Sequence, residues 1–194
     1  MLVIALTGPK GSGKDTVADI IYRRYTQEWY TVNRTAFADP IKQVVQQIFN
    51  LSPYGTSEYD LFKRTDLQYN LPGYTPSSVP GRHVVREIGM LMRKYDEKQF
   101  NNYVYKKITS GVFDTNRIEI VTDLRFDNEY TMLKQDLGAK IVKIKRPDYH
   151  YDGHITERGF DDELVDYVIN NTGSLVELQS EVIAMVKQFL QEKK

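Results

Sequence analysis

The chain has 194 residues, of which 41% are hydrophobic, which is enough to bury the core of one domain with insertions. Its 26 basic residues balance 26 acidic ones, so no net charge favours nucleic acid or an anionic membrane as a partner. The absence of cysteine excludes disulfides, thiolate zinc sites and thiol catalysis. The apolar start, residues 2–6, is too short for a signal peptide or a membrane span, and we expect a cytoplasmic protein.

Strand-like and helix-like segments alternate along the chain, which is typical of a parallel sheet covered by helices. In chain order, the pattern predicts a strand at 2–6, a helix at 14–28, a strand at 31–38, helices at 39–49, 82–95 and 97–109, a strand at 118–122, a helix at 128–137, strands at 141–144 and 167–170, and a last helix from 174. Asp39 and Pro40 predict an N-cap and a first-turn proline, while Ser174 and Glu177 form a capping box.

Two segments interrupt this alternation. Residues 51–81 are irregular and rich in proline and glycine, which predicts a functional excursion within a compact domain. The polar loop 146–162, with Arg146 and Arg158, resembles a lid that excludes water from a reacting phosphate, the alternative being an ordinary surface loop. We therefore expect a single domain with its core at 1–49 and 82–194 and an acceptor-binding excursion at 50–81.

Residues 8–16, GPKGSGKDT, have the composition of a phosphate-binding loop between the first strand and the first helix. Glycines allow the backbone to fold around a polyphosphate with its amides directed inward, and the helix N-terminus adds its positive end. This predicts that Gly11, Ser12, Gly13 and Lys14 bind ATP, with Lys14 reaching the β- and γ-phosphates. A glycine-rich turn without catalytic consequence is the alternative.

Asp15 stands where GTPases and motor proteins carry the serine or threonine that binds Mg²⁺, and Thr16 follows it. Small nucleotide kinases tolerate this change, with Thr16 on a phosphate and Asp15 meeting the metal through water. Asp123 follows the strand 118–122, at the sheet edge where Mg²⁺ finds hard oxygen ligands; a cap or turn aspartate is the alternative. The histidines lack metal-ligand spacing, so no transition metal is expected.

The acceptor side of the site is less defined by the sequence. Asp39 either caps a helix, or acts as a general base for a hydroxyl acceptor, or positions an acceptor phosphate, which needs no strong base. Arg125 can hold a phosphate with two hydrogen bonds. Other basic side chains gather where an acceptor anion must be neutralised, although each one alone reads as a solvated residue: Lys10, Arg64, Arg82, Arg86 and Arg93.

Six stretches together resemble the bacteriophage deoxynucleoside monophosphate kinases, a branch of the P-loop nucleotide kinase superfamily. These are residues 8–16, 37–42 (FADPIK), 121–129 (VTDLRFDNE), 144–147 (IKRP), 156–157 (TE) and 166–174 (DYVINNTGS). The resemblance implies a three-layer α/β/α nucleoside-kinase-like fold, ATP and Mg²⁺ as cofactors, and a deoxynucleoside monophosphate (dNMP) as the small-molecule substrate. It also suggests a homodimer.

The resemblance assigns roles to individual residues. Lys14 and Thr16 hold the ATP phosphates, and Lys10, Asp15 and Arg125 lie near the transferring phosphoryl group. The segment Asn171, Thr172 and Gly173 packs against adenine. Where relatives carry Arg-Glu-x-x-Gln, this chain has Arg82, His83 and Arg86, which bears on the range of bases accepted.

Two other functions fit the phosphate loop. One is a P-loop kinase with a hydroxyl acceptor, such as dephospho-coenzyme A, in which Asp39 would be essential. The other is a nucleotide-binding switch or assembly ATPase that responds to a macromolecule. Asp15 in place of a magnesium-binding serine counts against the switch.

Overall fold

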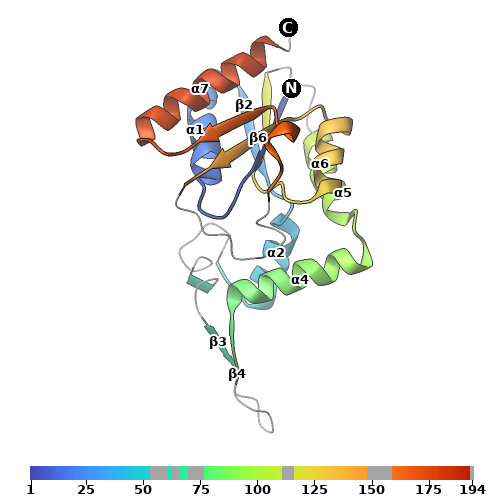
Figure 1. Ribbon diagram of the computed structural model, residues 1–194. Helices are drawn as coiled ribbons and strands as arrows, with labels where there is room; N and C mark the ends of the chain where they lie inside the picture. Colours follow the sequence, from blue (N-terminus) through green and yellow to red (C-terminus); the bar gives the residue numbers. More distant parts are fainter. Residues whose placement is uncertain (53–60, 63–65, 70–76, 111–115, 148–158, 193–194) are drawn as a thin grey trace. The chain divides into compact units, whose positions relative to one another are not determined.

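The computed structural model describes residues 1–52, 61–62, 66–69, 77–110, 116–147 and 159–192 (Figure 1). These residues belong to two compact units: Met1–Phe37 with Asn101–Lys194, here called the sheet unit, and Ala38–Phe100, here called the helical unit. The division into a core and an acceptor-binding excursion stays a prediction. Within the described parts of the chain, no helix has both the length and the apolar character that crossing a membrane requires.

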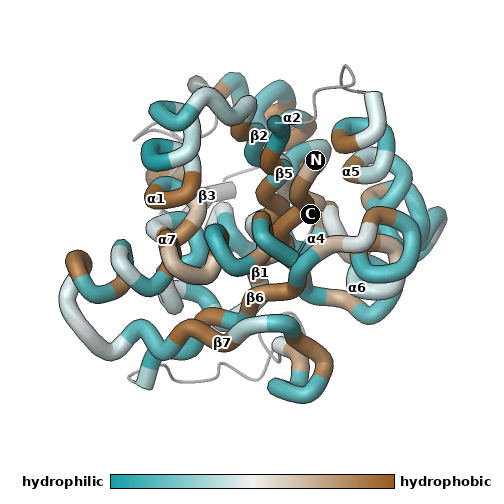
Figure 2. The backbone as a smooth tube through the Cα atoms, turned by 90° about the horizontal axis from the view of Figure 1, so that it is seen from above, coloured by the Kyte–Doolittle hydropathy of each residue, from teal (hydrophilic) through white to brown (hydrophobic). Residues whose placement is uncertain are grey.

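The sheet unit is built on five parallel strands in the order β2-β5-β1-β6-β7. Their bounds are β1 Leu2–Thr7, β2 Thr31–Thr35, β5 Arg117–Val121, β6 Lys140–Lys145 and β7 Tyr167–Asn170. Every residue of β1 and β5 is buried, as expected for central strands covered on both faces, and Figure 2 shows these strands as apolar. Because the strands are parallel, the loops that follow β1, β2 and β5 leave the same edge of the sheet.

Helices cover both faces of this sheet, which confirms the expected three-layer α/β/α fold. The helices α1 (Lys14–Thr26) and α7 (Leu175–Gln191) lie on one face (Figures 1 and 2), where Ile21 and Val182 belong to one buried apolar cluster with the strand residues Ile4 and Ile120. On the other face lie α5 (Gln99–Thr109), which begins in the helical unit, and α6 (Asp127–Thr131). A π-helical turn, η1 (Met132–Asp136), continues α6, and a 3₁₀ turn, η3 (Asp162–Leu164), precedes β7.

A buried polar cluster joins α5 to the sheet. The Arg117 guanidinium forms an ion pair with Glu119 at 2.5 Å and donates to the carbonyl oxygen of Ile108. Asn33 Nδ2 on β2 donates to the same Glu119 oxygen at 2.7 Å. Both charged side chains are more than nine-tenths buried, and burial at this cost requires the pairing they have.

The helical unit contains α2 (Asp39–Ile48), α4 (Gly81–Tyr95) and a two-stranded antiparallel sheet of β3 (Asp66–Tyr69) and β4 (Ser77–Pro80). Gly89 on α4 lies so close to Ile41 on α2 that a Cβ atom there would be 2.9 Å from Ile41 Cδ1.

Because β3 and β4 lie within residues 51–81, the prediction of irregular structure over this range is wrong for these two segments. The sequence of β4 lacks the alternation of apolar and polar residues by which strands are recognised, and in β3 the alternation extends over only four residues.

The predicted N-cap at Asp39 is also wrong. The helix α2 begins with Asp39 itself, Ala38 occupies the N-cap position, and Pro40 follows in the first turn. The Asp39 carboxylate accepts a hydrogen bond from Lys42 Nζ at 2.9 Å, one turn along the helix. An acidic residue inside the first turn is favourable for the helix dipole, so Asp39 stabilises this end in another way.

Candidate active site

The phosphate loop has a backbone that only glycine adopts without strain. Gly8, Gly11 and Gly13 have φ values of 139°, 77° and 107°. A Cβ atom at Gly8 would clash with the carbonyl oxygen of Ile144, and one at Gly13 would lie 2.5 Å from Asn171 Nδ2. The glycines of the motif thus permit both the turn and the close approach of β6 and β7 to it.

The carbonyl oxygens of the loop are held by side chains. Lys14 Nζ donates to the carbonyls of Gly8, at 2.8 Å, and Pro9, at 2.7 Å. Asn171 Nδ2 donates to the carbonyl of Ser12 at 2.8 Å, and Arg146 Nη1 donates to that of Gly11 at 3.2 Å. In the peptide between Ser12 and Gly13 the C=O and the N–H point in opposite directions, so the carbonyl held by Asn171 favours a Gly13 amide directed to the other side, as in an anion-binding nest.

The hydroxyl of Ser12 is also suited to a phosphate in this loop. Ser12 is fully buried, and its Oγ has no hydrogen-bond partner among the described residues. Such buried hydroxyls are rare unless a bound group completes them. A phosphate oxygen in the loop is a suitable partner, so this atom fits an ATP site.

The loop after β5 is tied to the ends of two neighbouring strands. Asp123 Oδ1 accepts a hydrogen bond from the Phe37 amide at 2.7 Å, beyond the end of β2. The Leu124 amide donates to the carbonyl of Leu6 on β1 at 3.2 Å, just before the phosphate loop. Arg125 follows Leu124 directly, so its backbone is held near the residues that lead into the phosphate loop.

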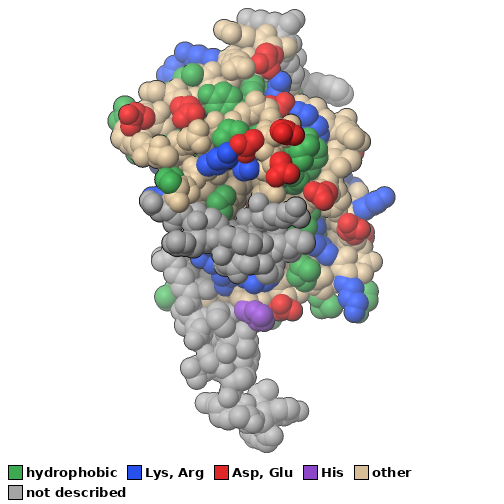
Figure 3. Space-filling model, in the orientation of Figure 1, with side chains coloured by type: hydrophobic (Ala, Val, Ile, Leu, Met, Phe, Trp, Pro, Cys, Tyr) green, Lys and Arg blue, Asp and Glu red, His purple; other side chains and the backbone are tan. Residues whose placement is uncertain are grey.

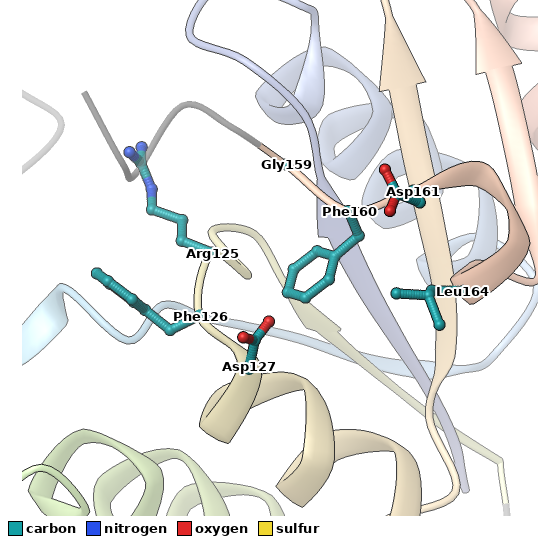
Figure 4. A pocket seen from close by; sticks show the side chains of 7 residues that line it. All are labelled: Arg125, Phe126, Asp127, Gly159, Phe160, Asp161 and Leu164. Carbon is teal, nitrogen blue, oxygen red and sulfur yellow. The ribbon is translucent and has the colours of Figure 1, made fainter. Parts of the chain in front are cut away.

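A buried glutamate fixes the backbone around Arg125. Glu129 is 1% exposed, and its Oε2 accepts from the amides of Arg125, at 2.9 Å, and Phe126, at 3.2 Å. The Arg125 side chain is left to line a pocket of about 180 Å³. Figure 4 shows this pocket, with the other lining residues coming from the start of α6 and from the segment before β7: Phe126, Asp127, Gly159, Phe160, Asp161 and Leu164.

The pocket wall before β7 is anchored to the sheet by charged side chains. Lys143 and Lys145 on β6 both donate to the carboxylate of Asp162, the former at 2.8 Å, and Lys143 Nζ also donates to the Phe160 carbonyl. These hydrogen bonds lower the pKa of the Asp162 carboxyl below its ordinary value. The ring of Phe160 stacks on that of Tyr130, with centroids 5.2 Å apart. Figure 3 shows acidic and basic side chains interspersed on the visible face.

Asp15 lies in the first turn of α1 with its side chain 85% exposed. Arg34 on β2 contacts it at 3.5 Å and forms a closer ion pair with Asp19. Sequence reasoning missed Arg34 because a single arginine in a strand reads as an exposed residue. Its place two residues after Val32, which packs in the core beneath α1, is the only signal that it faces that helix.

The remaining predicted residues are placed as follows. Lys10 and Thr172 are exposed, and Thr16 is half-buried. The backbone N–H of Asn171 donates to the Lys145 carbonyl at 2.8 Å. Gly173 lies against Glu177 in the capping box of α7, which the structure confirms with Ser174. Arg64, Arg158 and the lid segment 148–158 lie outside the described residues.

The arginines predicted for the acceptor lie on α4 of the helical unit. Arg82 and Arg86 are half-buried there. Arg93 is differently engaged, because its guanidinium lies over the ring of Phe100, 4.6 Å from the centroid. A stacked guanidinium of this kind serves packing, which leaves Arg82 and Arg86 as the α4 candidates for an anion.

A parallel sheet whose first strand leads through this loop into α1 defines a P-loop nucleotide-binding fold. The sequence also matches the family model "Deoxynucleotide monophosphate kinase" over residues 88–182, which confirms the expected resemblance. The match contains Asp123, Arg125 and Asn171 but begins beyond the phosphate loop, so loop and match are separate observations on one chain. Together they identify an ATP-dependent nucleotide kinase.

Solved structures give more distant likenesses. The Mycobacterium tuberculosis APS kinase CysC in complex with AMPPNP and APS is 13% identical, with a TM-score of 0.48 and coverage of 96% of this chain and 97% of that one. The crystal structure of APE1195 is 15% identical, with a TM-score of 0.44 and coverage of 96% and 95%. With TM-scores below 0.5, these likenesses do not bear on the substrate. No curated protein matches the sequence.

Proposed function

We propose that the protein transfers the γ-phosphoryl group of Mg-ATP to the phosphate of a dNMP, giving ADP and a deoxynucleoside diphosphate (dNDP). The observation that carries this proposal is the family match over 88–182, on a chain whose separate residues 8–16 form a phosphate loop. The nucleotide kinase class is established by that pair of observations. The deoxynucleotide acceptor is the proposed part.

The donor side is pre-organised by contacts already described. Asn171 and Arg146 hold the loop from outside, and Lys14 lies at its carbonyls, where a phosphate would attract the ammonium group. Positioned donors of this kind stabilise charge that develops on the β- and γ-oxygens without reorganisation during reaction. Thr16, half-buried at the start of α1, is the further proposed phosphate contact.

Mg²⁺ fits the carboxylates near the loop. Among the described residues no three histidine or acidic side chains gather into a protein-only metal cage. Mg²⁺ requires no such cage, because it is held by one or two carboxylates, substrate phosphates and water. Asp15, which is exposed, and Asp123, with one oxygen fixed by the Phe37 amide, are the proposed carboxylates. When bound, the ion neutralises charge on the β- and γ-oxygens.

In the proposed transfer an acceptor phosphate oxygen attacks the γ-phosphorus. The new P–O bond forms as the bond to the β–γ bridging oxygen breaks, and ADP leaves with that oxygen and the electron pair. Arg125 and Lys10 neutralise charge between donor and acceptor. The attacking oxygen is already ionised, so no strong base is required, and Asp39 has a positioning role beside Lys42.

The experiment compares two kinds of acceptor, and it tests whether the Asp39 carboxylate is required. ADP release from Mg-ATP is measured with dNMPs and with dephospho-coenzyme A, for the parent and for Asp39→Asn. A phosphate acceptor predicts stimulation by a dNMP and turnover in Asp39→Asn within about tenfold of the parent, less than loss of a general base costs. Stimulation by dephospho-coenzyme A alone, together with collapse of turnover in Asp39→Asn, would favour the hydroxyl acceptor. Asp136→Asn, at an exposed carboxylate on η1, is the control.

A further inference from the structure

Arg34 links the second strand to the first turn of α1. Arg34 lies near the carboxyl end of β2, two residues after Val32, and therefore on the face of the sheet that α1 covers. Its Nη1 donates to Asp19 Oδ1, and its Nη2 lies 3.5 Å from Asp15 Oδ1. One guanidinium thus contacts two carboxylates of the helix that begins at Lys14.

The two contacts are unequal. Asp15 and Asp19 are four residues apart, so they lie on one face of α1 and repel each other as like charges. Asp19 has the closer contact and is 52% exposed, whereas Asp15 has the longer contact and is 85% exposed. Asp19 therefore holds the guanidinium in place, and Asp15 is restrained only loosely. The planar guanidinium presents a separate nitrogen to each carboxylate, whereas a lysine would have to reach both from one ammonium nitrogen.

We propose that Arg34 is a positioning residue that sets the orientation of Asp15 for Mg-nucleotide binding, with Asp19 as its anchor. The proposal rests on the role proposed above for Asp15. Arg34 offsets the repulsion between the two carboxylates, and the exposed Asp15 carboxylate remains accessible to a metal-bound water. Loss of Arg34 leaves both carboxylates uncompensated and removes the contact that directs Asp15.

The test measures ADP affinity by calorimetry, with Mg²⁺ and with EDTA, so that no acceptor is needed. The readout is the factor by which Mg²⁺ strengthens ADP binding. In Arg34→Gln this factor should fall about five- to twentyfold, within the range of coupling between residues in contact. In an Asp15→Asn background, Arg34→Gln should leave the factor unchanged within about twofold. Arg34→Lys, which keeps the charge but must reach both carboxylates from one nitrogen, should fall between the parent and Arg34→Gln.

The outcomes separate this inference from its alternatives. If Arg34→Gln lowers the factor equally with and without Asp15, or lowers only the melting temperature, Arg34 is a structural residue and the inference is overturned. Arg34→Lys covers the case in which Arg34→Gln does not fold. Arg23→Gln, at an exposed arginine in the last turn of α1, is the matched control and should leave the factor unchanged. A coupled Arg34 in a protein that transfers nothing to dNMPs would refute only the proposed acceptor.

Discussion

The glycine at the start of α1 gives the sharpest test of the loop geometry. Gly13 has φ 107° and ψ 15°, outside the regions that alanine adopts freely. In Gly13→Ala the new Cβ would lie 2.5 Å from Asn171 Nδ2, which must move and lose its 2.8 Å hydrogen bond to the Ser12 carbonyl. The substitution therefore strains the backbone and removes one of the contacts that orient the loop.

The two effects can be sized separately. Backbone strain at such a residue costs about 1–3 kcal/mol. Loss of the Asn171 hydrogen bond adds about 0.5–1.5 kcal/mol. The free energy of unfolding should fall by about 2–4 kcal/mol, which lowers the melting temperature of a chain of this size by roughly 5–15 °C. If the loop relieves the strain by reorienting, ADP affinity falls by a similar free energy, about 30-fold or more.

Calorimetric ADP binding and thermal unfolding of Gly13→Ala check these values. The matched control is Gly138→Ala, which has φ 60° and no atom within 4 Å of the new Cβ, far along the chain from the loop. It should lose about 1–2 kcal/mol of stability and keep the parent's ADP affinity. Parent-like ADP binding by Gly13→Ala together with a parent-like melting temperature would refute the described geometry of this loop.

Three further predictions concern charge. Lys14→Ala should lower kcat/KM by about 10²–10³, since its charge acts on the transition state; near-normal turnover would contradict this. Burial, and after it the negative charge of Glu28, raises the pKa of Tyr25 to about 12 in the folded protein. The neutral phenol therefore stabilises the fold fully at pH values below the pKa of tyrosine in the unfolded chain, and this stabilisation is lost as the pH rises toward 12. In Tyr25→Phe, urea unfolding should lose this pH dependence. Glu119→Gln breaks the buried pair with Arg117 and should lower the free energy of unfolding by about 3–5 kcal/mol in the same assay. Glu28→Gln, in the half-exposed pair with Arg24, should lower it by less than about 1 kcal/mol, and equal costs would refute the importance of the buried pair.

Sequence reasoning predicted the phosphate loop because its information is local. A buried strand, three glycines and a helix start follow one another within residues 2–16. The contacts that hold the loop are not local. Asn171 and Arg146 are 159 and 135 residues from the loop residues that they contact, and only the order of the sheet brings β6 and β7 beside it.

The errors have physical causes of the same kind. Asp39 was predicted to be a cap because aspartate followed by proline often opens a helix. In the structure the helix includes Asp39, and the Asp39 carboxylate accepts a hydrogen bond from Lys42. The strands β3 and β4 have four residues each, and β4 lacks the alternation that predicts a strand. Arg34 could not be paired with Asp15 and Asp19 before the position of β2 beneath α1 was known.

The most direct test of the central proposal is the fate of the γ-phosphoryl group. The purified chain is incubated with γ-labelled ATP, Mg²⁺ and each dNMP, and the products are separated. The account predicts label in dNDP in amounts equal to the ADP formed, with at least one base, and loss of that label in Lys14→Ala. Label found only in inorganic phosphate, or only in a hydroxyl acceptor such as dephospho-coenzyme A, would contradict it.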